Sequence, residues 1–208
     1  MKGILRFVFK GLIHIFFLLF PPSVFAWCQS GFNQLYSLWL LNAFKSAGRC
    51  FLAYPQYING AKYIRLGDNC SFDKRLRLDA YDYYAGESFY PNLMIGNNVS
   101  IQQDCHIGCI NAVSIGNNVL IASKVYISDH FHGNITKEEA LISPVHRKLY
   151  SKGAVVIGDN VWIGEGVVIM PNVAIGESSI IGANAVVTCS FPSNVVIGGN
   201  PARVIKFL

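Results

Sequence analysis

The sequence contains no cysteine pair with CxxC spacing, and it lacks the cysteine density of a small disulfide-bonded secreted protein. Both absences argue against a disulfide framework. A thiol also behaves as a small, weakly polar residue that packs well in a core. We therefore expect reduced, buried cysteines in a reducing compartment, at Cys28, Cys50, Cys70, Cys105, Cys109 and Cys189.

Charged residues are also scarce, at 14% of the chain, and the basic ones are scattered instead of clustering with aromatic residues. A nucleic-acid surface would show such clusters, so we expect no nucleic-acid partner. The formal net charge of +5 is modest. A mildly basic surface suits anionic small molecules, such as phosphorylated cofactors, or anionic lipid headgroups.

No Asp, Glu, Lys or Arg occurs from Gly11 to Phe44, and this stretch follows three basic residues, Lys2, Arg6 and Lys10. A signal peptide would add cleavage near "SVFA", and a membrane-spanning helix would need about twenty apolar residues. Pro21-Pro22 interrupts the apolar run at its centre, which an interfacial anchor tolerates best. We expect residues 1–48 to form an apolar helical, membrane-associating segment.

A six-residue repeat dominates the remainder of the chain. From Ile157 the sequence reads "IGDNVW IGEGVV IMPNVA IGESSI IGANAV", with an isoleucine at every sixth position. Earlier blocks begin at Ile95 and Ile115, and "LGDNCS" from Leu66 matches in part. A period of six fits neither an α-helix nor an alternating strand. The fourth residue after the repeated aliphatic position is small or aliphatic, as at Cys70, Cys105, Val119, Val125, Val161, Val167, Val173 and Ala185.

Each hexad predicts a short strand with one large inward side chain, followed by a turn at Gly or Asn, whose backbones accept positive φ. Three such strands per coil would form a triangular solenoid in which every third isoleucine stacks in a column. We predict that Ile157 stacks on Ile175 and Ile163 on Ile181. The predicted fold class is all-β, a parallel β-helix over residues 49–208 behind the helical segment.

These hexads resemble those of the hexapeptide-repeat acyltransferases, which fold as left-handed parallel β-helices. "VWIGEGVVIMPNVAIGESSIIGANAVVTCSFPSNVVIGGNPARVIK", from Val161 to Lys206, is similar to the C-terminal signature of that family. "LRLDAYD", "CHIGCINAVSIGNNVLIASKVYISDHFHG" and "VWIG" look most like the O-acetyltransferases of bacterial surface polysaccharides, of the O-antigen and colanic-acid type. The resemblance covers about Tyr54 to Phe207. It implies transfer of acetyl from acetyl-CoA to a sugar hydroxyl of a surface polysaccharide or its lipid-linked precursor.

Acyl transfer to a hydroxyl needs a base for the hydroxyl proton and a hydrogen-bond donor for the oxyanion. Histidine is the usual base, and the resemblance implies His130 in this role, with direct attack on the thioester. His132 has a weaker claim: it could contact the acceptor or hydrogen-bond within its loop. His106 follows the inward Cys105, so it should point outward, either into the same cleft or as an ordinary surface histidine.

Three further residues are assigned to the acceptor side. Asp79, in "LRLDAYD", is the preferred acidic contact, with Arg77 on the same face; the alternative is a salt-bridged surface pair. Asp129 adjoins His130, but neighbours in an extended chain point to opposite faces. We therefore expect Asp129 to contact the acceptor and not to orient the His130 ring.

The resemblance also implies six contacts with coenzyme A, at Trp162, Gly164, Ala183, Thr188, Arg203 and Lys206. Trp162 would pack near the acyl-thioester end, and the backbones of Ala183 and Thr188 would contact the pantetheine arm. Arg203 would pair with phosphate, a geometry that guanidinium favours. The family often has a lysine after the position of Thr188, where this chain has Cys189, so one phosphate contact is in doubt.

The repeat is interrupted at about residues 131–154, which predicts a protruding loop. Long loops in compact folds are commonly functional, and this one could cover a neighbouring subunit's cleft. The resemblance implies a homotrimer with sites between subunits. Because acetyl-CoA is a cytoplasmic metabolite, we expect a cytoplasmic enzyme, peripheral on the inner face of the plasma membrane, where it would meet lipid-linked saccharides.

Alternative functions remain open at this point. A zinc lyase of the γ-carbonic-anhydrase kind would need three imidazoles on one metal. His106, His130 and His132 are candidates, but the spacing of the last two does not match that family, so no metal is expected. A purely structural solenoid has no need of "DHFHG" or "GGNPARVI". The enzyme could also use another acyl donor or acceptor.

Overall fold

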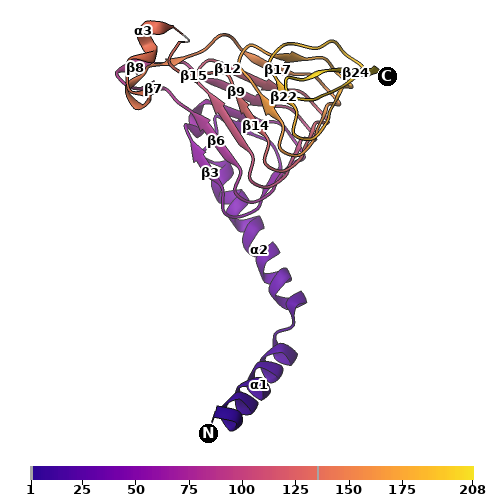
Figure 1. The fold of residues 1–208 in the computed structure, drawn as a ribbon. Helices are drawn as coiled ribbons and strands as arrows, with labels where there is room; N and C mark the ends of the chain where they lie inside the picture. Colours follow the sequence, from indigo (N-terminus) through magenta and orange to yellow (C-terminus); the bar gives the residue numbers. More distant parts are fainter. Residues whose placement is uncertain (1, 135) are drawn as a thin grey trace.

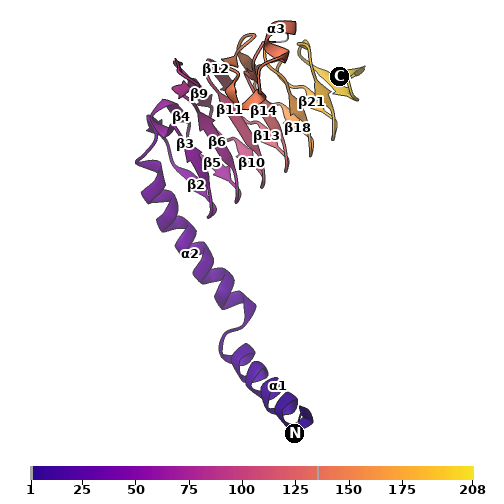
Figure 2. The ribbon, with the colours of Figure 1, turned by 60° about the vertical axis from the view of Figure 1, so that its left-hand side comes forward.

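The computed structural model describes residues 2–134 and 136–208. Two helices, α1 (Lys2–Leu19) and α2 (Pro22–Leu41), precede a stack of short-stranded coils. The helices form a stalk that projects from the first coil, and the C-terminus lies at the other end of the stack (Figures 1 and 2). The predicted helical segment and parallel β-helix are therefore both present.

The coils contribute their strands to three sheets. Sheet A contains, in spatial order, β1 (Ser46–Ala47), β4 (Ile64–Leu66), β9 (Asn92–Ile95), β12 (Ala112–Ile115), β17 (Val155–Ile157) and β20 (Ala174–Ile175). Sheet B contains β2 (Cys50–Leu52), β5 (Cys70–Phe72), β10 (Ser100–Ile101), β13 (Leu120–Ile121), β18 (Trp162–Ile163), β21 (Ile180–Ile181), β23 (Val195–Gly198) and β24 (Arg203–Phe207). Sheet C contains β22 (Val186–Val187), β19 (Val168–Ile169), β14 (Tyr126–Ser128), β11 (His106–Cys109), β6 (Arg77–Ala80) and β3 (Tyr57–Asn59). Pairing within these sheets is parallel, except that β24 runs antiparallel to β23.

The inward side chains form columns along the stack. Ile157 pairs with Ile175, and Ile163 with Ile181, so both predicted columns are confirmed. These side chains are at most 2% exposed. The small residues predicted inside each hexad are also buried, at Cys70, Cys105, Val119, Val125, Val161, Val167, Val173 and Ala185. Successive coils thus bury one another's apolar surface, which is the main source of stability in such a stack.

Asparagine and glycine serve different purposes at the corners. Asn98, Asn118 and Asn160 have φ of 56–58°, as predicted, and their side-chain amides hydrogen-bond from coil to coil at 3.0 and 3.1 Å. Gly96 does not have positive φ; a Cβ there would lie 2.6 Å from the carbonyl oxygen of Gly116 in the next coil. The prediction of positive φ is therefore right for the asparagines and wrong for Gly96, where close coil spacing requires glycine.

Two segments leave the stack on the same side. After β14 the chain forms β15 (Phe131–His132), α3 (Lys137–Ala140), a 3-10 turn (Pro144–His146) and β16 (Leu149–Tyr150). The sequence analysis recognised only this interruption, but a hairpin of β7 (Tyr83–Tyr84) and β8 (Glu87–Ser88) separates β6 from β9. The hairpin was missed because the repeat before Ile95 is too irregular to show a gap. Figure 1 shows the hairpin and α3 at the same corner.

The C-terminal half of α2 caps the first coil. The side-chain carbonyl oxygen of Asn33 accepts a hydrogen bond from the backbone N–H of Tyr54 at 3.0 Å. The hydroxyl of Ser37 accepts one from Leu52 at 2.7 Å, and Ser37 is 3% exposed. These contacts pair backbone groups that an uncovered first coil would leave without protein partners. A 3-10 turn (Ala61–Tyr63) follows in the next coil.

The rest of the stalk exposes large apolar side chains, including Leu5, Phe7, Phe9, Leu12, Phe16, Leu19, Phe25 and Trp27, each at least 59% exposed. No single helix among the described residues has the length and hydropathy to cross a membrane. Leu5–Leu19 and Pro22–Leu41 together, bent by 55° at the break between them, do have the length and composition of a broken span.

All six cysteines are unpaired. Cys70, Cys105 and Cys109 are buried, as predicted, and burial raises the pKa of the Cys105 thiol to about 11. The prediction of burial is wrong for Cys28 and Cys189, which are exposed. Cys28 lies on the stalk, which has little core of its own, and Cys189 lies in an exposed turn after β22.

Candidate active site

His130 lies just beyond the end of β14, and Asp129 holds its ring. Nδ1 of His130 is 2.8 Å from Oδ1 of Asp129, whose side chain has no exposed surface. The carboxylate also accepts hydrogen bonds from the backbone N–H groups of Ile110 and Asn111, at 3.0 and 2.8 Å. These donors compensate the buried negative charge. The carboxylate thus fixes the imidazole and leaves Nε2 as the nitrogen for chemistry.

Both expectations for Asp129 are therefore wrong. Its carboxylate does orient His130, and with 0% exposure it does not contact an acceptor. The physical reason is local: β14 ends at Ser128, and Asp129 occupies a bend. The alternation of side chains along an extended strand does not extend through a bend.

Gly108, which the sequence analysis did not select, provides space for the His130 ring. A Cβ at position 108 would lie 3.1 Å from Cε1 of His130. Gly108 pairs with Ser128 in the next coil, and the Ser128 hydroxyl donates to the carbonyl oxygen of His130 at 3.0 Å. A glycine at an outward strand position, two residues after His106, was the available signal.

Asp79 joins Arg77 and His106 on the same sheet. Its Oδ2 is 2.5 Å from Nε of Arg77 and 3.0 Å from Nε2 of His106. Burial by itself raises the pKa of Asp79, but the hydrogen bond from His106 and the charge of Arg77 outweigh burial and hold this pKa below its usual range. Asp79 is 5% exposed. The ion pair kept as an alternative is thus present, and Arg77 and His106 present this cluster to solvent.

A cavity of about 350 Å³ brings these groups together. Its lining consists of Arg77, Tyr81, His106, Gly108, Tyr126, His130, Phe131 and His132. His106 points outward, as predicted, and lines the same cavity as His130. Sequence reasoning missed Tyr126, which pairs with His106 in register and packs against its ring with centroids 5.3 Å apart.

Tyr81 was also missed, although it continues the outward alternation of Arg77 and Asp79. Its hydroxyl accepts a hydrogen bond from Nη2 of Arg77 at 3.2 Å. Its ring meets the His130 ring edge-on, with centroids 6.3 Å apart. Burial raises the pKa of Tyr81, so this hydroxyl stays protonated at neutral pH.

His132 lies at the rim of the cavity with a partner of its own, the hydroxyl of Tyr84, 3.4 Å from Nδ1. The three histidines near the cavity therefore have three different partners. Within the described ranges, no group of three or more His, Cys, Asp or Glu side chains could hold a metal ion. The zinc lyase alternative would require such a group.

The residues assigned to coenzyme A lie on the last coils. Trp162 projects from β18 with 51% exposure, and Arg203 is exposed on β24 with Lys206 further along the same strand. Ala183 and Thr188 are exposed in turns. A Cβ at Gly164 would lie 2.6 Å from the backbone nitrogen of Ala183, so only glycine fits there. None of the six lines the cavity around His130.

Known proteins with this repeat support a family assignment. The family profile described as "Bacterial transferase hexapeptide (six repeats)" matches residues 154–189. The putative lipopolysaccharide biosynthesis O-acetyl transferase WbbJ of Escherichia coli is 39% identical over 158 residues, which are 74% of this chain and 77% of that protein. The galactoside O-acetyltransferase of Escherichia coli is 41% identical over 124 residues, 57% of this chain and 56% of its own length.

Solved structures agree. The galactoside acetyltransferase in complex with coenzyme A superposes with a TM-score of 0.58 at 29% identity, covering 82% of this chain and 68% of that one. AntD, an N-acyltransferase from Bacillus cereus in complex with dTDP and coenzyme A, gives 0.67 at 20% identity, covering 83% and 87% or similar shares in its several complexes. The latter likeness concerns the fold alone. With the repeat, the coil architecture and these relatives combined, the chain belongs to the hexapeptide-repeat acyltransferases.

Proposed function

We propose that this enzyme transfers an acetyl group from acetyl-CoA to a hydroxyl of a saccharide, as part of a bacterial surface polysaccharide or its lipid-linked precursor. The observation that carries the proposal is the buried Asp129–His130 pair at the edge of a solvent-accessible cavity. Relatives described as O-acetyltransferases of lipopolysaccharide and colanic acid support the acceptor class. Neighbours bound to coenzyme A support the donor.

His130 acts as the general base. Nε2 accepts the proton of the acceptor hydroxyl while the hydroxyl oxygen forms a bond to the thioester carbonyl carbon. The tetrahedral intermediate then collapses, the C–S bond breaks, and the thiolate leaves with the proton from Nε2. Asp129 keeps the other proton on Nδ1 and stabilises the imidazolium that forms between these two transfers. The products are the sugar ester and free coenzyme A.

Coenzyme A binds along the last coils in this proposal, through Trp162, Gly164, Ala183, Thr188, Arg203 and Lys206. Because these residues do not line the His130 cavity of the same chain, the complete site needs a neighbouring copy. A homotrimer of left-handed β-helices, with each site between two subunits, meets this requirement. Sedimentation measurements on the purified enzyme test the trimer directly.

The stalk binds the inner face of the plasma membrane in this proposal. Arg6, Lys10 and His14 recur every fourth residue and therefore share one face of α1, beside exposed apolar side chains. No acidic residue precedes Asp68 in the sequence. Such a surface suits anionic headgroups and the outer acyl region of a bilayer. Flotation with anionic and neutral vesicles tests binding, and a truncated mature form in the periplasm would contradict it.

The activity itself is tested by incubating the enzyme with acetyl-CoA and a panel of free and lipid-linked saccharides. Acetylated products are identified by mass spectrometry, and thiol release is measured in parallel. Acceptor-dependent thiol release with a matching mass increase supports the proposal. Products carrying acetyl on nitrogen in place of oxygen, or transfer to none of the saccharides, would contradict it.

A further inference from the structure

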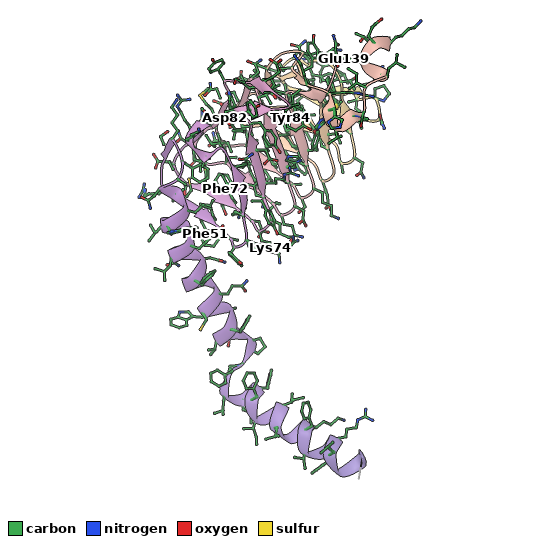
Figure 3. All side chains as sticks on the ribbon, turned by 90° about the vertical axis from the view of Figure 1, so that its left-hand side faces the viewer. Phe51, Phe72, Lys74, Asp82, Tyr84 and Glu139 are labelled. Carbon is green, nitrogen blue, oxygen red and sulfur yellow. The ribbon has the colours of Figure 1, made fainter. Side chains whose placement is uncertain are left out.

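The hairpin and the loop contact each other beside the His130 cavity. The hydroxyl of Tyr84, on β7, donates a hydrogen bond to the carbonyl oxygen of Val145 at 3.2 Å and lies 3.4 Å from Nδ1 of His132. Glu87, on β8, pairs with Lys148 of the loop. Figure 3 shows Tyr84 and Glu139 of the loop at the same end of the stack. Two insertions far apart in sequence thus form one wall.

The hydrogen-bond inventory fixes the role of His132 in this wall. Tyr84 has one hydroxyl proton, which the Val145 carbonyl accepts. His132 must therefore donate its Nδ1 proton to the Tyr84 oxygen, and in the neutral ring Nε2 is the acceptor. Their rings also meet edge-on with centroids 5.4 Å apart. His132 links the loop to the hairpin.

Aromatic rings connect the base to this link. The His130 ring meets Tyr81 at 6.3 Å, Tyr81 meets Tyr84 at 6.5 Å, and Tyr84 meets His132 at 5.4 Å, each in an edge-on arrangement. Tyr81 and Tyr84 are only half-buried. A row of partly exposed rings suits sugars, whose C–H faces pack on aromatic surfaces while their hydroxyls reach polar groups.

A second cavity, also about 350 Å³, lies on the loop side. Its lining consists of Phe131, His132, Gly133, Asn134, Thr136, Ala140 and Arg147. Phe131 and His132 line both cavities, so the two adjoin. Each is near the lower limit of small-ligand pockets, about 300 Å³, and together they exceed what a single sugar ring fills.

We propose that the second cavity binds the sugar unit next to the one that is acetylated, so that the acceptor is an oligosaccharide and not a monosaccharide. Tyr84 and His132 determine this specificity by holding the loop against the hairpin. The inference rests on the proposed function, since it extends the acceptor site around His130.

The test compares methyl glycosides of glucose, galactose, mannose and rhamnose with disaccharides that end in the same sugar. The wild type should favour the disaccharide in kcat/KM by about tenfold, the effect of one or two added hydrogen bonds. Tyr84→Phe and His132→Gln should lose this preference through KM, with monosaccharide activity unchanged. Tyr83→Phe, on the exposed side of the same hairpin, is the matched control and should behave as wild type. Equal use of both acceptors by the wild type would overturn the inference and leave the proposed function intact.

A binding measurement decides the inference even where no acceptor reacts. Saturation-transfer NMR of the disaccharides with the wild type and coenzyme A should show contact from both sugar rings, and Tyr84→Phe should weaken the signal of one. Contact from a single ring, or from none, would overturn the proposal. Coenzyme A alone protecting residues 133–147 from hydrogen exchange would do so too, because it would assign the second cavity to the donor.

Discussion

Nδ1 of His130 lies 2.8 Å from Oδ1 of Asp129, a carboxylate with no exposed surface that two backbone N–H groups also bind. The pair is built from adjacent residues at a bend, so it depends on the backbone path more than on long-range packing. A buried carboxylate held in this way is pre-organised for the imidazolium that forms during proton transfer. The predictions below follow from this arrangement and from the coils that support it.

Asp129→Asn should lower kcat by about 10²- to 10⁴-fold, the range that general-base assistance contributes. The amide cannot stabilise the imidazolium, and it leaves one buried backbone donor with a poorer acceptor. The KM for acetyl-CoA should stay near the wild-type value, since the coenzyme residues lie on other coils. Steady-state kinetics check this, and a variant with normal kcat would remove Asp129 from the mechanism.

Gly108→Ala should reduce kcat at least about tenfold without unfolding the enzyme. The added Cβ would lie 3.1 Å from Cε1 of His130, so the ring must shift, and small misplacements of a catalytic group are costly. Gly31→Ala is the control, because a Cβ there meets nothing within 4 Å. Kinetics and thermal unfolding of both variants separate a displaced base from a damaged fold; equal kcat in the two would contradict the account.

Asp79 should make stability depend on pH in one direction. Its pKa is lower in the folded protein than in the unfolded chain, so its contribution is present above the unfolded pKa of about 3.9 and is lost as the pH falls through the folded value. The unfolding temperature of Asp79→Asn should therefore fall below that of wild type at pH 6–7, and the gap should narrow below about pH 4. A gap that widens on acidification would show the opposite linkage.

Truncation should reveal where the stalk ends and the cap begins. Removing residues 1–31 should leave a stable enzyme, because Asn33 and Ser37 still bind the first coil. Removing residues 1–48 should lower stability by about 1–3 kcal/mol for each backbone donor left unpaired and buried. Thermal unfolding and hydrogen exchange at residues 52–54 compare the two forms. Equal stability would mean that α2 does not act as a cap.

The sequence was sufficient for the stack because a single period controls it. Isoleucine every six residues specified the columns Ile157–Ile175 and Ile163–Ile181, and the corner asparagines specified positive φ. The location of His106 followed from the same alternation. Local periodicity therefore carried the prediction wherever one residue's direction follows from its neighbours.

The site was less predictable because it is built where periodicity stops. Asp129 was misplaced since a bend, invisible in the repeat, turns its side chain under His130. Tyr84 was missed because its partners, His132 and Val145, are distant in sequence and belong to an insertion without a repeat. Contacts between two irregular segments depend on tertiary packing, which a single sequence does not encode locally.

The central claim, that His130 is the base of acetyl transfer, is tested by the steady-state rate of His130→Ala with acetyl-CoA and a saccharide that the wild type acetylates. We predict a fall in kcat of at least about 100-fold, with unchanged unfolding temperature and oligomeric state. His146→Ala, in the exposed loop, should retain wild-type activity. A His130→Ala enzyme with near-normal kcat would contradict the account.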